Sequence, residues 1–334
     1  MNILIDGMGG DHAPQEIVKG AIQAAREIED TVTIIGAEDL IKEELNSQRW
    51  DGSNIKVLNA TEVITNNEAP AMAVRKKKDS TVNRGVQMVK ECEADIFISG
   101  GSTGALLAAG LLGLGRIKGI KRPAIAAFFP QIGKDDTTLL LDCGANVDCK
   151  PEFLYQFGVM GSIFVQNVKG KESPDVRLLN VGAEAEKGDE LHKGAYELLA
   201  NSSINFQGNI EGREVVTGVC DVVVTDGFSG NIALKTLEGA AKNLLSLLKG
   251  KEKQPIFKSF AKFILRFFFK DAYHRLKRIN PDEYNGASLL GLTAVVVKSH
   301  GSANVDAFAR AIADAALQAR LQIPQKILAG LQRY

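Results

Sequence analysis

The sequence reads Ile3-Leu4-Ile5-Asp6-Gly7-Met8-Gly9-Gly10-Asp11-His12-Ala13-Pro14 near its start, and this stretch decides the class of fold. An apolar run gives way to glycines, an Asp-His pair and a proline, which predicts a buried strand, a tight turn and a helix beginning near the proline. Gly9 and Gly10 allow positive φ and leave room for a ligand against the backbone. The free N–H groups of the helix suit an anion. Asp6, Asp11 and His12 would stand at the carboxyl end of a strand, where open α/β sheets bind ligands. An ordinary strand–helix turn is the alternative, because G-x-G-G alone is a weak signal.

Apolar, β-branched runs alternate with helix-length segments along the chain. The expected strands are Ile3–Asp6, Val32–Ile35, Ile55–Leu58, Asp95–Ser99, Ala124–Phe128, Thr138–Leu141, Val176–Asn180, Ile204–Phe206, Asp221–Thr225 and Val295–Lys298. The expected helices are Gln15–Ile28, Thr81–Glu91, Gly104–Gly115, Phe153–Val168, Glu190–Ala200, Asn231–Leu248 and Asn304–Leu321. Strands without polar alternation, separated by helices, predict an α/β fold with a mainly parallel sheet covered by helices on both faces. No Pro-, Gly- or Ser-rich linker divides the chain, so we expect a single domain over residues 1–334 with a helical arm inserted at residues 250–280.

Composition bounds the class of protein. The chain has 334 residues, of which 45% are hydrophobic and 24% charged, so it can bury a large core. The N-terminus lacks the basic and apolar segments of a signal peptide, and no apolar run approaches a membrane span. The four cysteines lie in or beside apolar runs without metal-ligand spacing, which is typical of reduced thiols in a cytoplasmic protein. We therefore expect a cytoplasmic protein with no bound metal and no nucleic-acid partner.

Four further strand ends carry glycine-rich or polar sequence. They are the turns Ser99-Gly100-Gly101-Ser102-Thr103-Gly104, Asp142-Cys143-Gly144-Ala145-Asn146-Val147-Asp148, Asn180-Val181-Gly182-Ala183-Glu184 with Lys187 and Gly188 just beyond, and Thr225-Asp226-Gly227-Phe228-Ser229-Gly230-Asn231. The carboxyl ends of parallel strands lie on one edge of a sheet. The five turns therefore predict a single extended cleft, with unconnected turns as the alternative.

Taken together, these motifs resemble one family closely, the bacterial phosphate acyltransferases of phospholipid synthesis (the PlsX family). Its members carry a D-x-M-G-G-D-H-A-P start and S-x-G-x-T-G-A, L-D-x-G-A-N, N-x-G-x-E and V-x-D-G-F-x-G-N segments. The resemblance runs from Met1 to about Leu321. Ser102, Ala183 and Asn285 depart from it, because they stand where asparagine, threonine and glycine are usual.

The resemblance implies a function and a set of partners. It implies transfer of a long-chain fatty acyl group from acyl carrier protein to inorganic phosphate, which gives acyl phosphate for phosphatidic acid synthesis. It implies no cofactor, and hand-over of the product to a membrane glycerol-phosphate acyltransferase. It also implies a homodimer of Rossmann-like subunits related to phosphotransacetylases and isopropylmalate-type dehydrogenases.

Attack of phosphate on a thioester needs little activation of the nucleophile, so we expect direct attack without an acyl-enzyme. The site must hold an anion, stabilise an oxyanion and place a donor near the departing thiolate. Backbone N–H groups of the glycine-rich turns suit the phosphate. The candidate phosphate- and substrate-binding residues are Asp6, Gly9, Gly10, Asp11, Ser102, Thr103, Gly104, Asp226, Gly227, Gly230 and Lys235. The candidate catalytic residues are His12, Asn146, Lys187 and Asn231.

Each main candidate has a role, and some have a plainer alternative. Lys187 and Lys235 are cationic partners for phosphate, although Lys235 also fits a solvated helix face. Asn146 and Asn231 suit donation to an oxyanion. His12 suits donation to phosphate or protonation of the thiolate, and a helix-cap or core histidine is the alternative.

Two other residues are weaker candidates. His300 ends a late strand, within Lys298-Ser299-His300-Gly301-Ser302. Cys143 invites an acyl-enzyme. No histidine or other base is close to it in sequence, however, and the apolar run Leu139-Leu140-Leu141 favours a core thiol.

A short basic segment indicates a surface for a partner. Arg75, Lys76, Lys77 and Lys78 follow Pro70 on an expected helix. They suit docking of an acidic acyl carrier protein, with a solvated charge run as the alternative.

The expected arm has the most distinctive charge in the chain. Between Lys242 and Arg278, eleven Lys and Arg are opposed only by Glu252 and Asp271. The expected membrane-binding residues are Phe257, Phe260, Phe263, Phe267, Phe268, Lys262 and Arg266. A phenylalanine stripe beside a basic ridge is typical of an interfacial helix on an anionic membrane. We therefore expect peripheral attachment to the inner face of the plasma membrane, and a helix packed on a partner subunit is the alternative.

Two other functions stay open from the sequence. A nicotinamide-dependent dehydrogenase of the isopropylmalate type fits a similar sheet. The first turn is not G-x-G-x-x-G, however, and no ribose-binding acid stands out about 20 residues further on. A non-enzymatic membrane scaffold that binds acyl carrier protein is the second, but it would have no need of a lined cleft.

Overall fold

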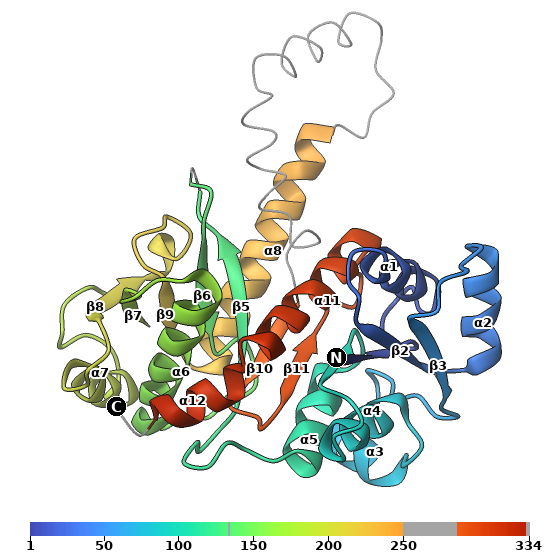
Figure 1. The fold of residues 1–334 in the computed structure, drawn as a ribbon. Helices are drawn as coiled ribbons and strands as arrows, with labels where there is room; N and C mark the ends of the chain where they lie inside the picture. The colour runs from blue at the N-terminus through green and yellow to red at the C-terminus, as the bar shows by residue number, and fades with distance from the viewer. Residues whose placement is uncertain (133, 250–285, 332–334) are drawn as a thin grey trace, which may run out of the picture.

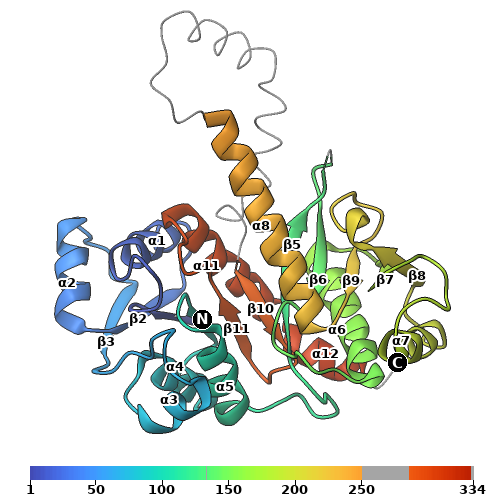
Figure 2. The same ribbon diagram turned by 180° about the vertical axis from the view of Figure 1, so that it is seen from behind.

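The computed structural model describes residues 1–132, 134–249 and 286–331, and Figures 1 and 2 show it from opposite sides. Its strands are β1 (Asn2–Asp6), β2 (Thr31–Gly36), β3 (Ile55–Asn59), β4 (Ile96–Ser99), β5 (Ala124–Pro130), β6 (Thr137–Leu141), β7 (Val176–Asn180), β8 (Phe206–Glu211), β9 (Val222–Val224), β10 (Ala287–Leu290) and β11 (Val295–Lys298). Its α-helices are α1 (Gln15–Ala25), α2 (Glu38–Ser47), α3 (Pro70–Lys76), α4 (Thr81–Lys90), α5 (Thr103–Gly113), α6 (Pro151–Lys169), α7 (Glu190–Ala200), α8 (Gly227–Lys249), α11 (Val305–Arg320) and α12 (Ile323–Gly330). The strands form one sheet in the order β3-β2-β1-β4-β11-β10-β5-β6-β9-β7-β8. Most neighbouring pairs are parallel, so the predicted α/β class is confirmed.

Helices cover both faces of this sheet. In β1, Ile3 and Ile5 point toward α1 and α11, and α6, α7 and α12 lie on the same face further along the sheet. Leu4 points to the opposite face, where α3, α4, α5 and α8 pack. Burial on both sides explains why β1 is apolar without alternation. Because α5 and α8 share a face (Figure 2), they frame the part of the sheet that carries the site.

Three antiparallel pairs reverse the direction of half of the sheet. β10 is antiparallel to both β11 and β5, and β5 is antiparallel to β6, to which a short turn joins it. β6, β9, β7 and β8 therefore run opposite to β1, β2, β3, β4 and β11. The expectation that all five polar turns leave the same edge is wrong, because a short turn returns the chain antiparallel to the strand before it.

Three elements were not expected from the sequence. β10 has four residues and gives too short an apolar run to stand out. α2 buries only Ile41, so its apolar periodicity is weak. α12 carries Pro324 at its second position, where proline is tolerated because the first N–H groups of a helix have no partner within it. Apolar periodicity in the sequence therefore does not predict elements that are short or that bury few side chains.

The start of α8 and the bounds of β8 also differ from expectation. α8 begins at Gly227 rather than at Asn231, because the Asp226 carboxylate accepts the N–H groups of Phe228 and Ser229, each at 2.9 Å. β8 begins at Phe206, where the expected strand ended.

Within the described part of the chain, no helix has both the length and the apolar character needed to cross a bilayer. The predicted arm at residues 250–280 lies outside the described residues, and so do the seven predicted membrane-binding residues and Asn285.

Candidate active site

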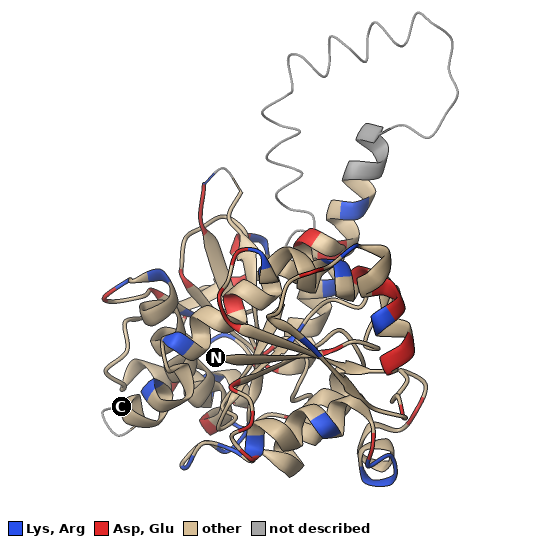
Figure 3. Ribbon diagram, turned by 45° about the vertical axis from the view of Figure 1, so that its right-hand side comes forward, with Lys and Arg blue, Asp and Glu red and all other residues tan. Residues whose placement is uncertain are grey.

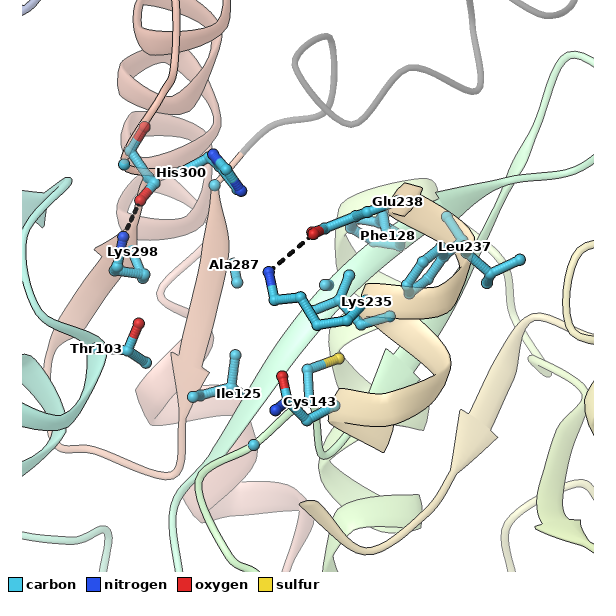
Figure 4. A pocket seen from close by; sticks show the side chains of 18 of the residues that line it. Thr103, Ile125, Phe128, Cys143, Lys235, Leu237, Glu238, Ala287, Lys298 and His300 are labelled. Carbon is cyan, nitrogen blue, oxygen red and sulfur yellow. Dashed lines mark hydrogen bonds and ion pairs between the residues drawn. The ribbon is translucent and has the colours of Figure 1, made fainter. Parts of the chain in front are cut away.

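A cavity of about 500 Å³ lies between α8, β5 and the turns that follow β4 and β11 (Figure 4). Four of the five predicted polar turns contribute to its lining, through Asp11, Thr103, Gly144 and Asn231 with some of their neighbours. The turn after β7 does not line it. The predicted cleft therefore exists, but it forms over a face of the sheet and not along one edge.

Lys298, at the end of β11, is a residue that the sequence reasoning missed. It pairs with Ser99 of β4 on one side and with Ala287 of β10 on the other, and it lines the cavity. Its Nζ donates to the backbone oxygens of Gly100, at 3.2 Å, and Ser299. Burial lowers the pKa of Lys298 to about 8, although the nearby Asp6 carboxylate opposes the shift. Lys298 therefore stays mostly positive at neutral pH beside the anion-binding turns.

His300 has a better position for chemistry than the predicted His12. His300 lines the cavity, whereas the His12 residue is exposed and outside that lining. The Ser302 N–H donates to His300 Nδ1 at 3.2 Å, so the neutral ring carries its proton on Nε2. Burial lowers the pKa of His300, which favours that neutral form. The catalytic role of His12 stays a prediction, and His300 offers a hydrogen-bond donor to the cavity.

Helix α8 contributes charged and polar side chains to the cavity wall. Lys235 Nζ lies 2.8 Å from Glu238 Oε2, and Figure 4 shows this ion pair at the cavity. Asn231 lies one turn earlier on α8, close to Gly144. The predicted residues Asn231 and Lys235 thus reach the same space as Asp11 and Thr103.

At several glycines of the predicted phosphate turns, a neighbouring turn of the chain occupies the space that a side chain would need. A Cβ added at Gly9 would lie 2.4 Å from Asp6 Oδ2 and 2.7 Å from the Gly101 nitrogen. A Cβ added at Gly230 would lie 1.9 Å from the Asp142 oxygen. The turn after β1 therefore packs on the turn after β4, and the turn after β9 packs on the turn after β6. Glycine at these positions brings two turns together.

Other predicted residues hold the turns in shape. Asp6 is buried and accepts from Ser99 Oγ at 2.6 Å, and burial raises the pKa of this carboxyl. The Asn146 amide group donates to the Pro123 oxygen and to Asp142 Oδ2, each at 2.8 Å, so both of its N–H groups are engaged. Asp6 and Asn146 therefore suit a role in holding these turns in place.

The remaining glycines and the serine of the predicted set lie in the same turns. Ser102 Oγ accepts the Ala105 N–H at the start of α5, and Gly104 lies against Pro70. The Gly227 N–H donates to the Asn146 oxygen at 2.7 Å. Gly10 has a φ of +132° and lies beside Gly301.

Lys187 and the basic segment at the end of α3 lie away from the cavity lining. Lys187 is exposed in the turn after β7, and its roles in phosphate binding and catalysis stay predictions. Lys77 Nζ contacts Glu68 Oε2 at 2.8 Å and the Val63 oxygen at 2.7 Å, so this lysine is part of the local structure. Arg75, Lys76 and Lys78 are exposed.

Cys143 is buried at the cavity wall in the form expected of a core thiol. Burial raises the pKa of Cys143 well above its usual range, and the Asp142 carboxylate adds to the shift. Its Sγ donates to the Leu140 oxygen at 3.3 Å. A protonated thiol is a poor nucleophile, so the position of Cys143 does not favour an acyl-enzyme. Among the described residues, no group of three His, Cys, Asp or Glu is placed to hold a metal ion.

The sequence matches the model of a family described as "Fatty acid synthesis protein" over residues 1–326. It is 46% identical to a phosphate acyltransferase of Clostridium tetani, over 93% of this chain and 92% of that one. It is 47% identical to a phosphate acyltransferase of Halothermothrix orenii, over 93% of each chain. The chain belongs to the phosphate acyltransferase family.

Solved structures with the same fold include two phosphotransacetylases. The enzyme from Streptococcus pyogenes gives a TM-score of 0.63 at 17% identity, over 96% of this chain and 94% of that one. The enzyme from Staphylococcus aureus gives 0.61 at 16% identity, with the same coverage. This phosphate acyltransferase is thus an acyltransferase built on the Rossmann-like fold of those enzymes. Its relatives of 46% and 47% identity favour that function over a dehydrogenase or a scaffold.

Proposed function

We propose that this phosphate acyltransferase takes a long-chain acyl group from acyl carrier protein, and that inorganic phosphate attacks the thioester directly. The observation that carries the proposal is the make-up of one cavity, in which cationic and donor groups stand beside an apolar wall. A thioester of a fatty acid has the same division into a polar reacting end and an apolar chain.

The polar side of the cavity suits phosphate. Lys298 supplies positive charge and Thr103 supplies a hydroxyl group. Gly101 has no side chain, so phosphate can come close to the backbone in the turn before α5. The start of α5 adds the partial positive charge of a helix N-terminus. His300 Nε2–H can donate to phosphate or to the carbonyl oxygen as it becomes negative.

Lys298 also suits the departure of the thiol. The phosphate oxygen forms a bond to the carbonyl carbon, and the carbon–sulfur bond breaks with its electron pair on sulfur. A cysteine thiol, the reference thiol in proteins, has a pKa of about 8.5, and the pKa of Lys298 is about 8. Transfer of a proton from its ammonium to the thiolate is therefore close to balanced, as general acid catalysis favours.

The apolar side of the cavity suits the acyl chain. Alternate residues of β5 share one face of the strand and line the cavity, namely Ile125, Ala127 and Phe129. Helix α8 adds Leu234 and Leu237 to this lining. Each methylene buried there contributes about 0.8 kcal/mol, so a long chain supplies much of the binding energy.

The reaction is tested with the full chain, palmitoyl-acyl carrier protein and labelled inorganic phosphate. Acyl phosphate should form without nucleotide or nicotinamide. A thioester left intact by folded protein would contradict the proposal, and a nicotinamide-dependent absorbance change would favour the dehydrogenase. Cys143→Ala serves as a control and should keep most activity. A folded but inactive Cys143→Ala variant would instead support an acyl-enzyme.

The proposal extends to membrane attachment and to a homodimer. Acyl phosphate is labile in water and carries a long apolar chain, so release beside a membrane glycerol-phosphate acyltransferase favours its use. The support for attachment is the sequence of the arm, in which phenylalanines recur at a spacing typical of one helix face and basic residues recur every four positions.

Replacing Phe263 and Phe267 together with Asp should abolish binding to anionic vesicles in a sedimentation assay, because it removes apolar burial and adds repulsion. Activity on acyl carrier protein in solution should survive. Salt should weaken binding of the unaltered protein, since exposed charges are screened within about 10 Å at 0.1 M. A variant that stays on vesicles would exclude these two phenylalanines from membrane contact.

A further inference from the structure

A second cavity, of about 630 Å³, lies at the opposite end of β5 from the β5–β6 turn. Its lining is basic, and it consists of Leu111, Arg116, Lys121, Arg122, Lys150, Glu152 and Phe153. We call Arg116, Lys121, Arg122 and Lys150 the basic cluster. All four residues are exposed, and none forms a salt bridge within the residues that the structure describes. The unpaired positive charge indicates an anionic partner.

The loop that carries most of the basic cluster is fixed to helix α6. The Lys121 N–H donates to Gln156 Oε1 at 2.8 Å, and Gln156 Nε2 donates to the Gly119 oxygen at 2.9 Å. The Arg122 guanidinium lies 5.8 Å from the centre of the Phe153 ring. Figure 3 shows this loop, between α5 and β5, with its blue segments at the lower left. A surface held in place loses little conformational freedom when a partner binds.

Residues of the basic cluster are close in the chain to residues that line the reaction cavity. Arg122 and Pro123 immediately precede β5, whose second residue, Ile125, lines that cavity. The Pro123 oxygen accepts from Asn146 Nδ2 at 2.8 Å. Asn146 belongs to the turn that places Gly144 in the reaction cavity, and the same segment continues to Lys150. Residues 142–150 thus contribute to both cavities, through Gly144 in one and Lys150 in the other.

The reaction cavity extends along β5, from Ile125 to Pro130. At the start of β5, Ile125 is next to Cys143, whose N–H donates to the Ile125 oxygen at 2.9 Å, and polar Asn231 and Gly144 lie there. Toward the other end the lining includes Phe129, Pro130 and Val216, with the Lys235–Glu238 ion pair on the α8 side. Lys298 lies between the two ends, because it pairs with Ala287 and the next residue, Ser288, pairs with Ala126 of β5. Ile125 and Pro130 are about 16 Å apart at a strand rise of about 3.3 Å per residue.

The position of Lys298 bears on the direction from which the carrier approaches. With the thioester at Lys298 and the acyl chain along Phe129, Pro130 and Val216, the amide-containing arm of the carrier leaves past Ile125 and Gly144, toward the basic cluster. We propose that the acidic surface of acyl carrier protein docks on Arg116, Lys121, Arg122 and Lys150. The inference rests on the proposed function, and it differs from the docking site predicted from sequence at Arg75, Lys76, Lys77 and Lys78.

Two double variants with the same change of charge separate these surfaces. Lys121→Glu with Lys150→Glu reverses charge in the basic cluster, and Arg75→Glu with Lys76→Glu does so in the last turn of α3. Lys121 and Lys150 make no side-chain contact that holds the loop in the described structure. Each variant is assayed for acyl phosphate with palmitoyl-acyl carrier protein and with palmitoyl-pantetheine, which has no protein carrier.

The Lys121→Glu, Lys150→Glu variant should raise KM for palmitoyl-acyl carrier protein about tenfold or more at low salt, because steering by opposite charge is lost. Its kcat and its turnover of palmitoyl-pantetheine should stay near those of the unaltered protein. The control variant should keep its KM. An unchanged KM in the first variant, an equal rise in the control, or equal loss with both thioesters would overturn the docking site. If the unaltered protein makes acyl phosphate from neither thioester, the proposed function fails instead.

Discussion

Lys298→Met should lower turnover with phosphate about a hundred- to thousandfold, which is the usual cost of losing one group that stabilises a transition state. The variant removes the cation at the end of β11 and the acid proposed for the departing thiol. Methionine is similar in length and suits the half-buried position, so the fold should survive. Initial rates of acyl phosphate formation, with circular dichroism as the check on folding, measure the effect. Near-normal turnover in a folded Lys298→Met variant would remove Lys298 from the mechanism.

The pH dependence gives a second readout on the same residue. Activity of the unaltered protein should fall as pH rises through about 8, because Lys298 then loses its proton. This loss should not reflect unfolding. An unfolded lysine keeps its proton to about pH 10.4, so between these values the contribution of Lys298 to the free energy of unfolding rises with pH. Lys298→Arg keeps its charge throughout and should flatten the alkaline limb at reduced activity. An unshifted limb in Lys298→Arg would assign the fall to another group.

Gly230→Ala should destabilise the protein by several kcal/mol, beyond the ~0.5–3 kcal/mol of most single substitutions. The added Cβ would lie 1.9 Å from the Asp142 oxygen and 2.8 Å from Thr225 Cγ2, so backbone must move. The Asp142 carboxylate accepts backbone N–H groups from Ile125, Gly144 and other residues, and movement would disturb that buried network. Urea unfolding, followed by circular dichroism, measures the loss.

Gly239→Ala is the matched control on the same helix. Nothing lies within 4 Å of its added Cβ in the described structure, and alanine should stabilise a helix interior by about 0.5–1 kcal/mol over glycine. If Gly230→Ala proves as stable as the unaltered protein while losing phosphate binding, Gly230 serves the ligand and not the packing of two turns.

The sequence predicted the strands and the polar turns well, because both follow from local pattern. The run from Ile3 to Ile5 is buried on both sides and reads as a strand without reference to the rest of the chain. Four of the five turns then meet at one cavity. The direction of β6 could not be predicted, because it depends on a short turn after β5 and on the four-residue strand β10.

The individual side chains were harder to predict than the turns that carry them. Lys298 escaped notice because it ends an apolar strand and belongs to no glycine-rich motif. A lysine directly after Val295-Val296-Val297 was the available signal, since charge at the end of a buried strand needs a partner. Lys187 lies in a polar turn like the others, but β7 is next to the edge strand β8, away from β4 and β11. Strand order, which fixes this separation, is not written in any local motif.

The central claim is that phosphate binds in the cavity between α8, β4 and β11, against the thioester. The most direct measurement is an experimental structure of the full chain with inorganic phosphate bound, paired with a phosphate titration of Lys298→Met and Lys187→Met. We expect phosphate within hydrogen-bonding distance of Lys298 Nζ and Thr103 Oγ1, and weaker binding in Lys298→Met alone. Phosphate seated at the turn after β7, with binding lost in Lys187→Met and kept in Lys298→Met, would contradict it.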